Sequence, residues 1–183
     1  IVFRGFMPLG LMLPDDGASG GKIDEQESCA LMFITDSRAA KVRHLNHPAS
    51  PSLVECCWWL DEAGVQFRIS GRAVLATANS EEPLLRAASM AVWERLQIST
   101  KRTFIWQSPG EPIAGADAGD IAPGADAEPT LEEAHFALVV VLPERVDELH
   151  LGGKQRRVMY TLEGAGADDS RNSQLAASST DLL

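Results

Sequence analysis

The sequence predicts a mainly β fold, an antiparallel β-barrel or sandwich with a few helices attached. Apolar and β-branched runs with the length of a strand recur along the chain. Clusters of Gly, Pro, Asp and Ser separate these runs, as turns and loops require. Only one long segment repeats apolar residues with the spacing of a helix. The 183 residues are enough for one domain, or at most a small pair.

Four strands and one short helix are predicted in the first part of the chain. The strands cover residues 1–6, 30–35, 53–60 and 65–75. Asp36 and Ser37 offer an N-cap for a helix over residues 37–45. Residues 61–64, with the sequence Asp-Glu-Ala-Gly, predict a hairpin turn between the third and fourth strands.

One long helix and three further strands are predicted in the second part. Residues 81–98 repeat apolar side chains every three or four positions, and Pro83 lies in the first turn, where proline is tolerated. The neighbouring charges of Lys101 and Arg102 are interpreted as a solvated helix end. The strands cover residues 136–142, 145–151 and 155–162.

The net charge of −10 is distributed unevenly. Residues 111–133 contain seven acidic residues and no basic one, and residues 163–183 contain four acidic residues and one basic residue. The rest of the chain carries 15 residues of each sign and is neutral. Neither acidic segment shows an apolar period. We therefore expect a disordered insertion at 111–133 and a disordered tail at 163–183, with a folded domain over residues 1–162.

Composition excludes several partners and compartments. A neutral domain lacks the basic surface that neutralises nucleic-acid phosphates, so no nucleic-acid partner is expected. No apolar run approaches the ~20 residues that cross a bilayer, so no membrane partner is expected. The three cysteines, Cys29, Cys56 and Cys57, resemble neither a disulfide framework nor a metal-binding knuckle, which favours a cytoplasmic location. Because Ile1 reads as the middle of a strand, we expect the sequence to be truncated.

Signatures of several enzyme classes are absent from the sequence. It contains no GxGxxG after a strand, no GxxxxGK[ST], no HExxH and no GxSxG. The four histidines are scattered, without metal-like spacing to a carboxylate, so no metal site is predicted. No side chain stands out as a catalytic acid or base.

The segment from Thr35 to Lys41 carries the most informative pattern of charges. A buried strand ends in the hydroxyl of Thr35, and a predicted helix follows with Arg38 and Lys41 on one face. Free N–H groups and the helix dipole favour an anion at such a place, which indicates a phosphate. The alternative is a solvated helix face on which the two cations pair with Asp36 or another neighbour.

Two further polar residues lie in predicted strands. Gln66 can turn two donors and an acceptor toward a flat heterocycle, or it is an ordinary polar residue on the outer face of its strand. Arg4, beside Gly5, is either a surface cation or a donor aimed at a ligand.

Six short patterns occur in order along the chain. They are FRGF at residues 3–6, TDxRxxK at 35–41, ExCW at 55–58, QFRxSGRA at 66–73, FxWxxPG at 104–110 and PERV at 143–146. This series resembles the pyridoxamine 5'-phosphate oxidase-like flavoproteins, and most closely a less characterised branch of that superfamily with an FMN-binding domain. The resemblance covers most of residues 1–162.

The resemblance implies a split β-barrel homodimer that holds FMN in a cleft between its subunits. By position, Arg4 matches a basic residue at the end of the first flavin-contacting strand. Thr35 matches a hydroxyl at a strand end, and Lys41 matches the phosphate-binding lysine. Gln66 matches the glutamine beside the isoalloxazine ring. Arg38 is placed to replace a phosphate arginine that is missing here.

The chain departs from the family pattern at several positions. Ala39 and Ala40 occupy the places of a serine and an arginine next to the phosphate lysine. His150 aligns near a tryptophan that backs the flavin, and Tyr160 aligns with a flavin-binding arginine. The substrate motif Arg-x-His is represented by Arg156-Arg157-Val158, without the histidine. An activity that forms pyridoxal phosphate therefore does not carry over from the resemblance.

The function implied by the resemblance is an FMN-dependent oxidoreductase. The flavin would transfer a hydride to or from a small, anionic substrate, with Arg156 or Arg157 available for the anionic group. The alternative is a non-catalytic flavin-binding or carrier protein, or a degenerate split-barrel scaffold that has lost the cofactor. The sequence names neither the substrate nor the electron acceptor.

Overall fold

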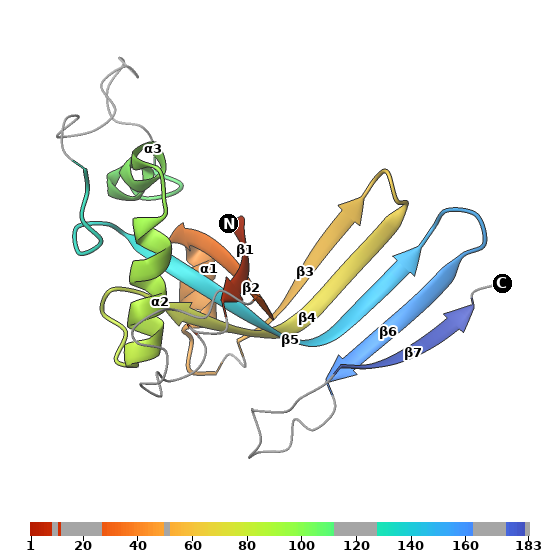
Figure 1. Cartoon of the computed structure of the whole chain (residues 1–183). Coiled ribbons are helices and arrows are strands. Elements are labelled where there is room, and N and C mark those ends of the chain that lie inside the picture. Colours follow the sequence, from red (N-terminus) through yellow and green to blue (C-terminus); the bar gives the residue numbers. More distant parts are fainter. Residues whose placement is uncertain (9–10, 12–26, 50–51, 112–127, 163–174, 182–183) are drawn as a thin grey trace. The chain divides into compact units, whose positions relative to one another are not determined.

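The computed structural model describes residues 1–8, 11, 27–49, 52–111, 128–162 and 175–181 (Figure 1). The chain divides into two compact units. Unit 1 comprises Ile1–Ser50 and Val74–Val140, and unit 2 comprises Pro51–Ala73 and Val141–Leu183.

Strands dominate the described residues. They are β1 (Val2–Pro8), β2 (Glu27–Asp36), β3 (Leu53–Leu60), β4 (Val65–Ala76), β5 (Phe136–His150), β6 (Arg156–Leu162) and β7 (Leu175–Asp181). The hydrogen-bonded order is β1-β2-β5-β4-β3, with β6 pairing with β5 and β7. The helices are α1 (Ala40–Leu45), α2 (Pro83–Glu94) and α3 (Ile98–Arg102), and the 3₁₀ turn η2 (Thr103–Ile105) follows α3 directly. The predicted class, mainly antiparallel β with a few helices, is confirmed.

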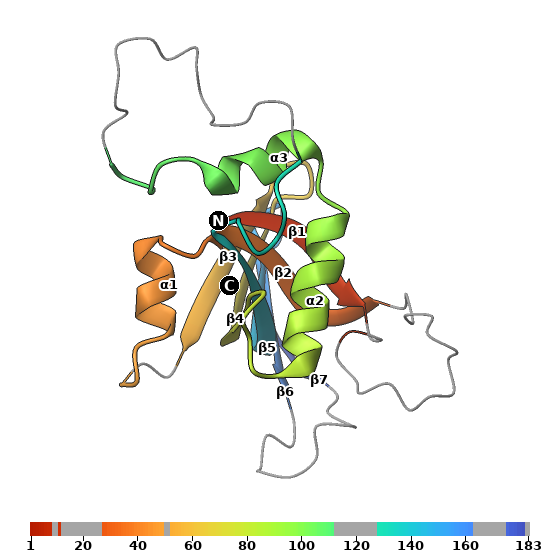
Figure 2. The same ribbon diagram turned by 90° about the vertical axis from the view of Figure 1, so that its left-hand side faces the viewer.

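The core of unit 1 forms where α2 packs on the sheet (Figure 2). The continuous apolar run from Phe136 to Val140 in β5 is buried on both faces, as is the run from Ala30 to Ile34 in β2. Trp93 of α2 contacts the rings of Phe104 and Phe136, with centroids 6.1 and 5.3 Å away. This aromatic cluster fixes α2 and η2 against β5.

A β-bulge interrupts the pairing of β1 with β2. Phe3 lies opposite Phe33, and Gly5 lies opposite Met32, so Arg4 is the extra residue on β1. Gly5 adopts φ +116°, which other residues rarely reach. A bulge redirects the side chains around it, and here it determines where Arg4 points.

In unit 2, β3 and β4 form the predicted hairpin. Their register runs from Leu53 opposite Arg72 to Leu60 opposite Val65. Gly64 closes the turn with φ +61°, and its N–H donates to the carbonyl of Asp61 over 3.1 Å. The predicted strand boundaries hold here because both the turn and the pairing are local in sequence.

The first helix begins later than predicted. α1 starts at Ala40, and its N-cap residue Ala39 makes no side-chain capping bond. Asp36, the expected N-cap, instead accepts the backbone N–H of Arg38 over 2.8 Å. Such a local side-chain-to-backbone bond competes with helix formation, and the N-cap prediction is therefore wrong.

The long helix predicted over residues 81–98 is also wrong in its extent. α2 ends at Glu94, and α3 begins at Ile98. The N–H of Leu96 donates to the carbonyl of Trp93, three residues earlier, over 3.0 Å. This tightened last turn ends the α-helical path although the apolar spacing continues through Leu96.

The strands predicted over residues 136–142 and 145–151 form one strand, β5. Pro143, which has no N–H to donate, lies between the two predicted strands. Proline accommodates extended backbone, so the strand continues through it.

Parts of the two predicted disordered segments are described. Within 111–133, Leu131 is buried, and Glu128 forms an ion pair with Lys101. Within 163–183, β7 pairs with β6 from Leu175 opposite Leu162 to Asp181 opposite Arg156, which differs from the expected disorder. Backbone pairing along an open strand edge needs no apolar sequence, which explains why composition missed this strand. Residues 112–127, 163–174 and 182–183 lie outside the described residues, and the domain boundary at residue 162 stays a prediction.

Within the described part of the chain, no helix has the length and apolar character needed to span a bilayer. The cytoplasmic location stays a prediction.

Candidate functional site

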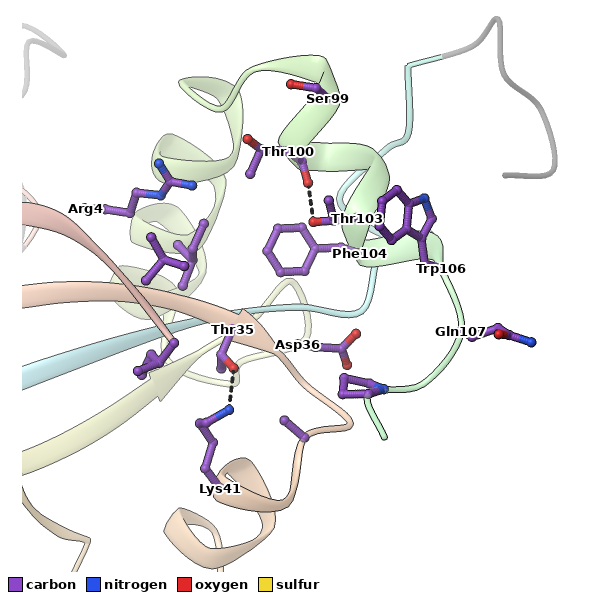
Figure 3. Close-up of a pocket in the computed structure, with 15 residues that line it drawn as sticks. Arg4, Thr35, Asp36, Lys41, Ser99, Thr100, Thr103, Phe104, Trp106 and Gln107 are labelled. Atoms are coloured by element: carbon purple, nitrogen blue, oxygen red, sulfur yellow. Dashed lines mark hydrogen bonds between the residues drawn. The ribbon is translucent and has the colours of Figure 1, made fainter. Parts of the chain in front are cut away.

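A pocket of about 600 Å³ opens in unit 1, where β1, β2, α1 and the α3–η2 segment meet (Figure 3). Its polar lining includes Arg4, Thr35, Asp36 and Lys41. The volume lies within the range of about 300–1,000 Å³ typical of small-molecule sites. Three of the residues predicted from the sequence as cofactor ligands therefore reach one pocket.

Thr35 and Lys41 meet on one side of this pocket. Thr35 is the last buried residue of β2, and its hydroxyl accepts a long hydrogen bond of 3.5 Å from the Lys41 ammonium (Figure 3). An ammonium carries three donors, so two remain for a ligand. Lys41 itself is exposed, and its charge is therefore accessible to an anion entering the pocket.

Arg4 approaches the pocket from β1 (Figure 3). The bulge at this residue takes Arg4 out of regular pairing, and the side chain extends toward the α3 side of the pocket. Arg4 and Lys41 thus bring two cations to one cavity from different elements.

Arg38, predicted as a phosphate ligand, is paired with a carboxylate in the structure, and its role toward a phosphate stays a prediction. Its guanidinium forms a two-point ion pair with Asp36, with Nε–Oδ1 and Nη2–Oδ2 distances of 3.0 and 2.7 Å. This hydrogen-bonded pairing raises the pKa of the Arg38 guanidinium above its ordinary value. The structure thus shows the pairing with Asp36 that was the alternative to phosphate binding.

Gln66 and Arg156 lie in unit 2. The side-chain oxygen of Gln66 accepts a hydrogen bond of 3.0 Å from Arg68 Nε. Arg156 is exposed, and its Nη2 lies 3.4 Å from Nε2 of His150. The roles predicted for these residues stay predictions.

Arg157, also in unit 2, is held by a buried carboxylate. Its Nε and Nη2 donate to Asp147 over 2.8 and 2.6 Å, and Asp147 is only 6% exposed. Hydrogen bonding from Arg157 lowers the pKa of Asp147, and the nearby charges of Arg68 and Arg145 add to this. Two of the five N–H donors of Arg157 are thus engaged, and its charge is paired within the protein.

Replacing Arg157 by methionine is expected to destabilise the protein at neutral pH and to have little effect in acid. Because the pKa of Asp147 is lowered in the folded state, its stabilisation is present above the ordinary carboxyl pKa of about 3.9 and is lost as the pH falls through the folded-state pKa. Urea unfolding of both proteins over a pH series measures this. In an Asp147→Asn background, the Arg157 substitution should have no pH-dependent effect. A deficit that persists unchanged into acid would contradict the assignment.

The α3–η2 segment contributes part of the pocket that site predictions from the sequence did not include. Ser99, Thr100 and Thr103 supply hydroxyls, and Trp106 supplies an aromatic ring that is 40% exposed. The FxWxxPG pattern was the available signal, because it placed an aromatic pair directly before a turn. Without a known partner segment, that pattern did not reveal which side chains face a cavity.

Lys101, by contrast, is not the solvated charge predicted. It is 6% exposed, forms an ion pair with Glu128 and places its ammonium 5.6 Å from the centroid of the Trp93 ring. Both partners lie far from the helix end in sequence, and they offset the cost of burying the charge. Lys101 therefore belongs to the packing behind α3.

Among the described residues, no group of three or more His, Cys, Asp or Glu side chains is arranged to hold a metal ion.

Comparison with known proteins links this geometry to a family. Residues 1–77 match the family model of the pyridoxamine 5'-phosphate oxidase, FMN-binding domain. The pyridoxine/pyridoxamine 5'-phosphate oxidase 2 of Arabidopsis thaliana is 27% identical over 161 residues, which cover 85% of this chain and 67% of that protein. The resemblance inferred from the six motifs is confirmed.

Solved structures give the same result for the fold. A pyridoxamine 5'-phosphate oxidase-related, FMN-binding protein from Nostoc punctiforme matches with a TM-score of 0.68 and 29% identity, covering 100% of this chain and 78% of that one. PhzG from Burkholderia lata matches with a TM-score of 0.52 and 14% identity over 90% of this chain and 78% of that one, which concerns the fold alone. The predicted fold class, an antiparallel split barrel with a few helices, is confirmed.

Proposed function

We propose that this chain, whose sequence and fold resemble the pyridoxamine 5'-phosphate oxidase FMN-binding domains, binds FMN and serves as a flavin-dependent oxidoreductase. One observation carries the proposal. Arg4, Thr35 and Lys41 converge on a single pocket, and all three lie in the part of the chain that matches the family model.

The residues of the pocket fit the chemistry of FMN. Lys41 and Arg4 provide positive charge for a phosphate, and the Lys41 ammonium keeps free donors beside the hydroxyl of Thr35. The hydroxyls of Ser99 and Thr100 suit a polyol chain. The half-exposed ring of Trp106 offers a flat apolar surface of the kind on which a heteroaromatic ring packs.

When bound, FMN would supply hydride transfer, and the chain would supply binding, orientation and exclusion of water. The resemblance assigns Gln66 to the edge of the flavin ring and Arg156 or Arg157 to an anionic substrate group. Of these two arginines, Arg156 is the better candidate, because the charge of Arg157 is already paired with the buried Asp147 through two hydrogen bonds. The described residues include no evident acid or base, which is compatible with direct hydride transfer.

A second copy of the chain is part of the proposal, because the resemblance implies a homodimer with FMN between subunits. Exposed apolar side chains on β3 support it: Leu53, Trp59 and Leu60 are 57%, 46% and 48% exposed. Apolar residues gathered on one exposed hairpin are typical of a surface that another chain covers.

The second candidate function is non-catalytic binding or transport of flavin. The departures at Ala39, Ala40, His150 and Tyr160 favour this reading, since they remove residues that the family places around the cofactor.

The purified wild-type protein should bind FMN at least about 10-fold more tightly than riboflavin, because only FMN carries the phosphate that Lys41 and Arg4 would bind. Quenching of flavin fluorescence measures both affinities. The FMN-loaded protein is then mixed with a reduced nicotinamide or an amine donor. Bleaching of the flavin absorbance supports the oxidoreductase, persistent colour supports the carrier, and a chain that takes up no FMN overturns both functions.

A further inference from the structure

We propose that Arg38 is a positioning residue, which ties the Trp106–Gln107 rim of the pocket to the end of β2 and neutralises Asp36. This positioning role would replace the direct contact with a phosphate that the sequence predicts for Arg38. Only the effect on FMN affinity rests on the proposed function, because the contacts that define this role lie within the protein.

The guanidinium of Arg38 is fixed on one side by Asp36. Oδ1 of Asp36 accepts both the Arg38 backbone N–H, over 2.8 Å, and its Nε, over 3.0 Å, while Oδ2 accepts Nη2 over 2.7 Å. The two side chains are 25% and 12% exposed. A fork held at two points on a poorly exposed carboxylate, with the backbone N–H bonded to the same group, has little freedom to turn toward a ligand.

On its other side the same guanidinium reaches a distant segment of the chain. Nη2 donates to the backbone carbonyl of Trp106 over 2.9 Å and to that of Gln107 over 3.3 Å. Both residues line the pocket (Figure 3). Arg38 itself does not line the pocket, so it acts on the cavity through the residues it holds.

Apart from the Arg38 contacts, packing stabilises the Trp106–Gln107 rim only weakly. The side chain of Trp106 is 40% exposed, and its backbone has left the 3₁₀ path of η2 for an extended conformation. Burial therefore contributes little to its position, and the Arg38 contacts act at the backbone of a residue that lines the pocket.

The ion pair between Arg38 and Asp36 also determines the net charge of the pocket wall near Asp36. Asp36 lines the cavity, and an unpaired carboxylate there would repel an anionic ligand. Arg38 cancels this charge, so the pair adds no net attraction for a phosphate. The accessible positive charge near Thr35 then comes from Lys41 and Arg4.

Hydrogen–deuterium exchange of the ligand-free protein tests the positioning role without FMN. In Arg38→Met and in Arg38→Lys, the amides of residues 106–111 should exchange at least about five-fold faster, because lysine lacks the fork that reaches carboxylate and carbonyls together. The exposed Arg43 of α1 provides the control, and Arg43→Met should leave this exchange unchanged. Unchanged exchange in both Arg38 variants would overturn the proposal.

FMN titration tests the neutralisation of Asp36 by Arg38. Arg38→Met should weaken FMN binding about 10-fold, and adding Asp36→Asn should restore part of that loss while the fast exchange of 106–111 remains. If the second substitution restored nothing, Asp36 would not be the charge that Arg38 neutralises, and the proposal would be wrong. A wild-type chain that binds no FMN would sink the proposed function, yet the exchange measurement would still decide the role of Arg38.

Discussion

Replacing Lys41 by alanine is expected to weaken FMN binding by roughly 10- to 150-fold, which corresponds to about 1.5–3 kcal/mol for a hydrogen bond to a charged group. Lys41 is exposed at the pocket. Among the described residues its ammonium is held by the long 3.5 Å bond to Thr35, so two of its three donors remain for a ligand. The dissociation constant is obtained by titrating the apoprotein with FMN and following flavin fluorescence.

Riboflavin localises the effect to the phosphate. It lacks that group, so its affinity should change little in Lys41→Ala. Arg43→Ala, on the same helix but outside the pocket lining, provides the matched control for a general loss of positive charge. Equal losses for FMN and riboflavin, or unchanged FMN affinity, would remove Lys41 from the phosphate site.

The sequence predicted best those features whose determinants are local. The β3–β4 hairpin follows from a Gly-containing turn between two apolar runs, and its register agrees with that prediction. Thr35 and Lys41 are likewise close in the chain, and they meet because one ends a strand and the other lies in the next helix. Arg4 reaches the same pocket from a different strand, and only the motif resemblance linked it to them.

Features that depend on distant partners were not predictable from the sequence. Arg38 lies 68 residues from the carbonyl of Trp106, and no local pattern shows that a guanidinium will bridge them. Lys101 was predicted to be a solvated charge, whereas the structure places Glu128 and the Trp93 ring beside its ammonium. Both residues were assigned from their charge and their position in the sequence, whereas their roles depend on which backbone and side-chain groups the fold brings to them.

Replacing Gly71 by alanine is expected to destabilise the protein by about 3 kcal/mol or more, the upper part of the range for overpacking. A Cβ at this position would lie 2.0 Å from the carbonyl oxygen of Leu142 and 2.9 Å from Cα of Pro143. Both are backbone atoms, so no side chain can rotate away to relieve the contact. The melting temperature should fall by about 6–12 °C for a chain of this size.

Gly152→Ala is the matched control, because it makes the same chemical change in the same unit. A Cβ there would meet no atom within 4 Å, and no positive φ accompanies Gly152. Alanine restricts the unfolded chain more than glycine does, so this variant should be neutral or more stable by up to about 1 kcal/mol. The changes in stability caused by Gly71→Ala and Gly152→Ala should therefore differ in sign or by several-fold, although the two substitutions are chemically identical. Equal melting temperatures of Gly71→Ala and Gly152→Ala would show that β4 and β5 are farther apart at Gly71 than in the structure. Close packing of the two strands would then not explain the glycine of the SGRA motif.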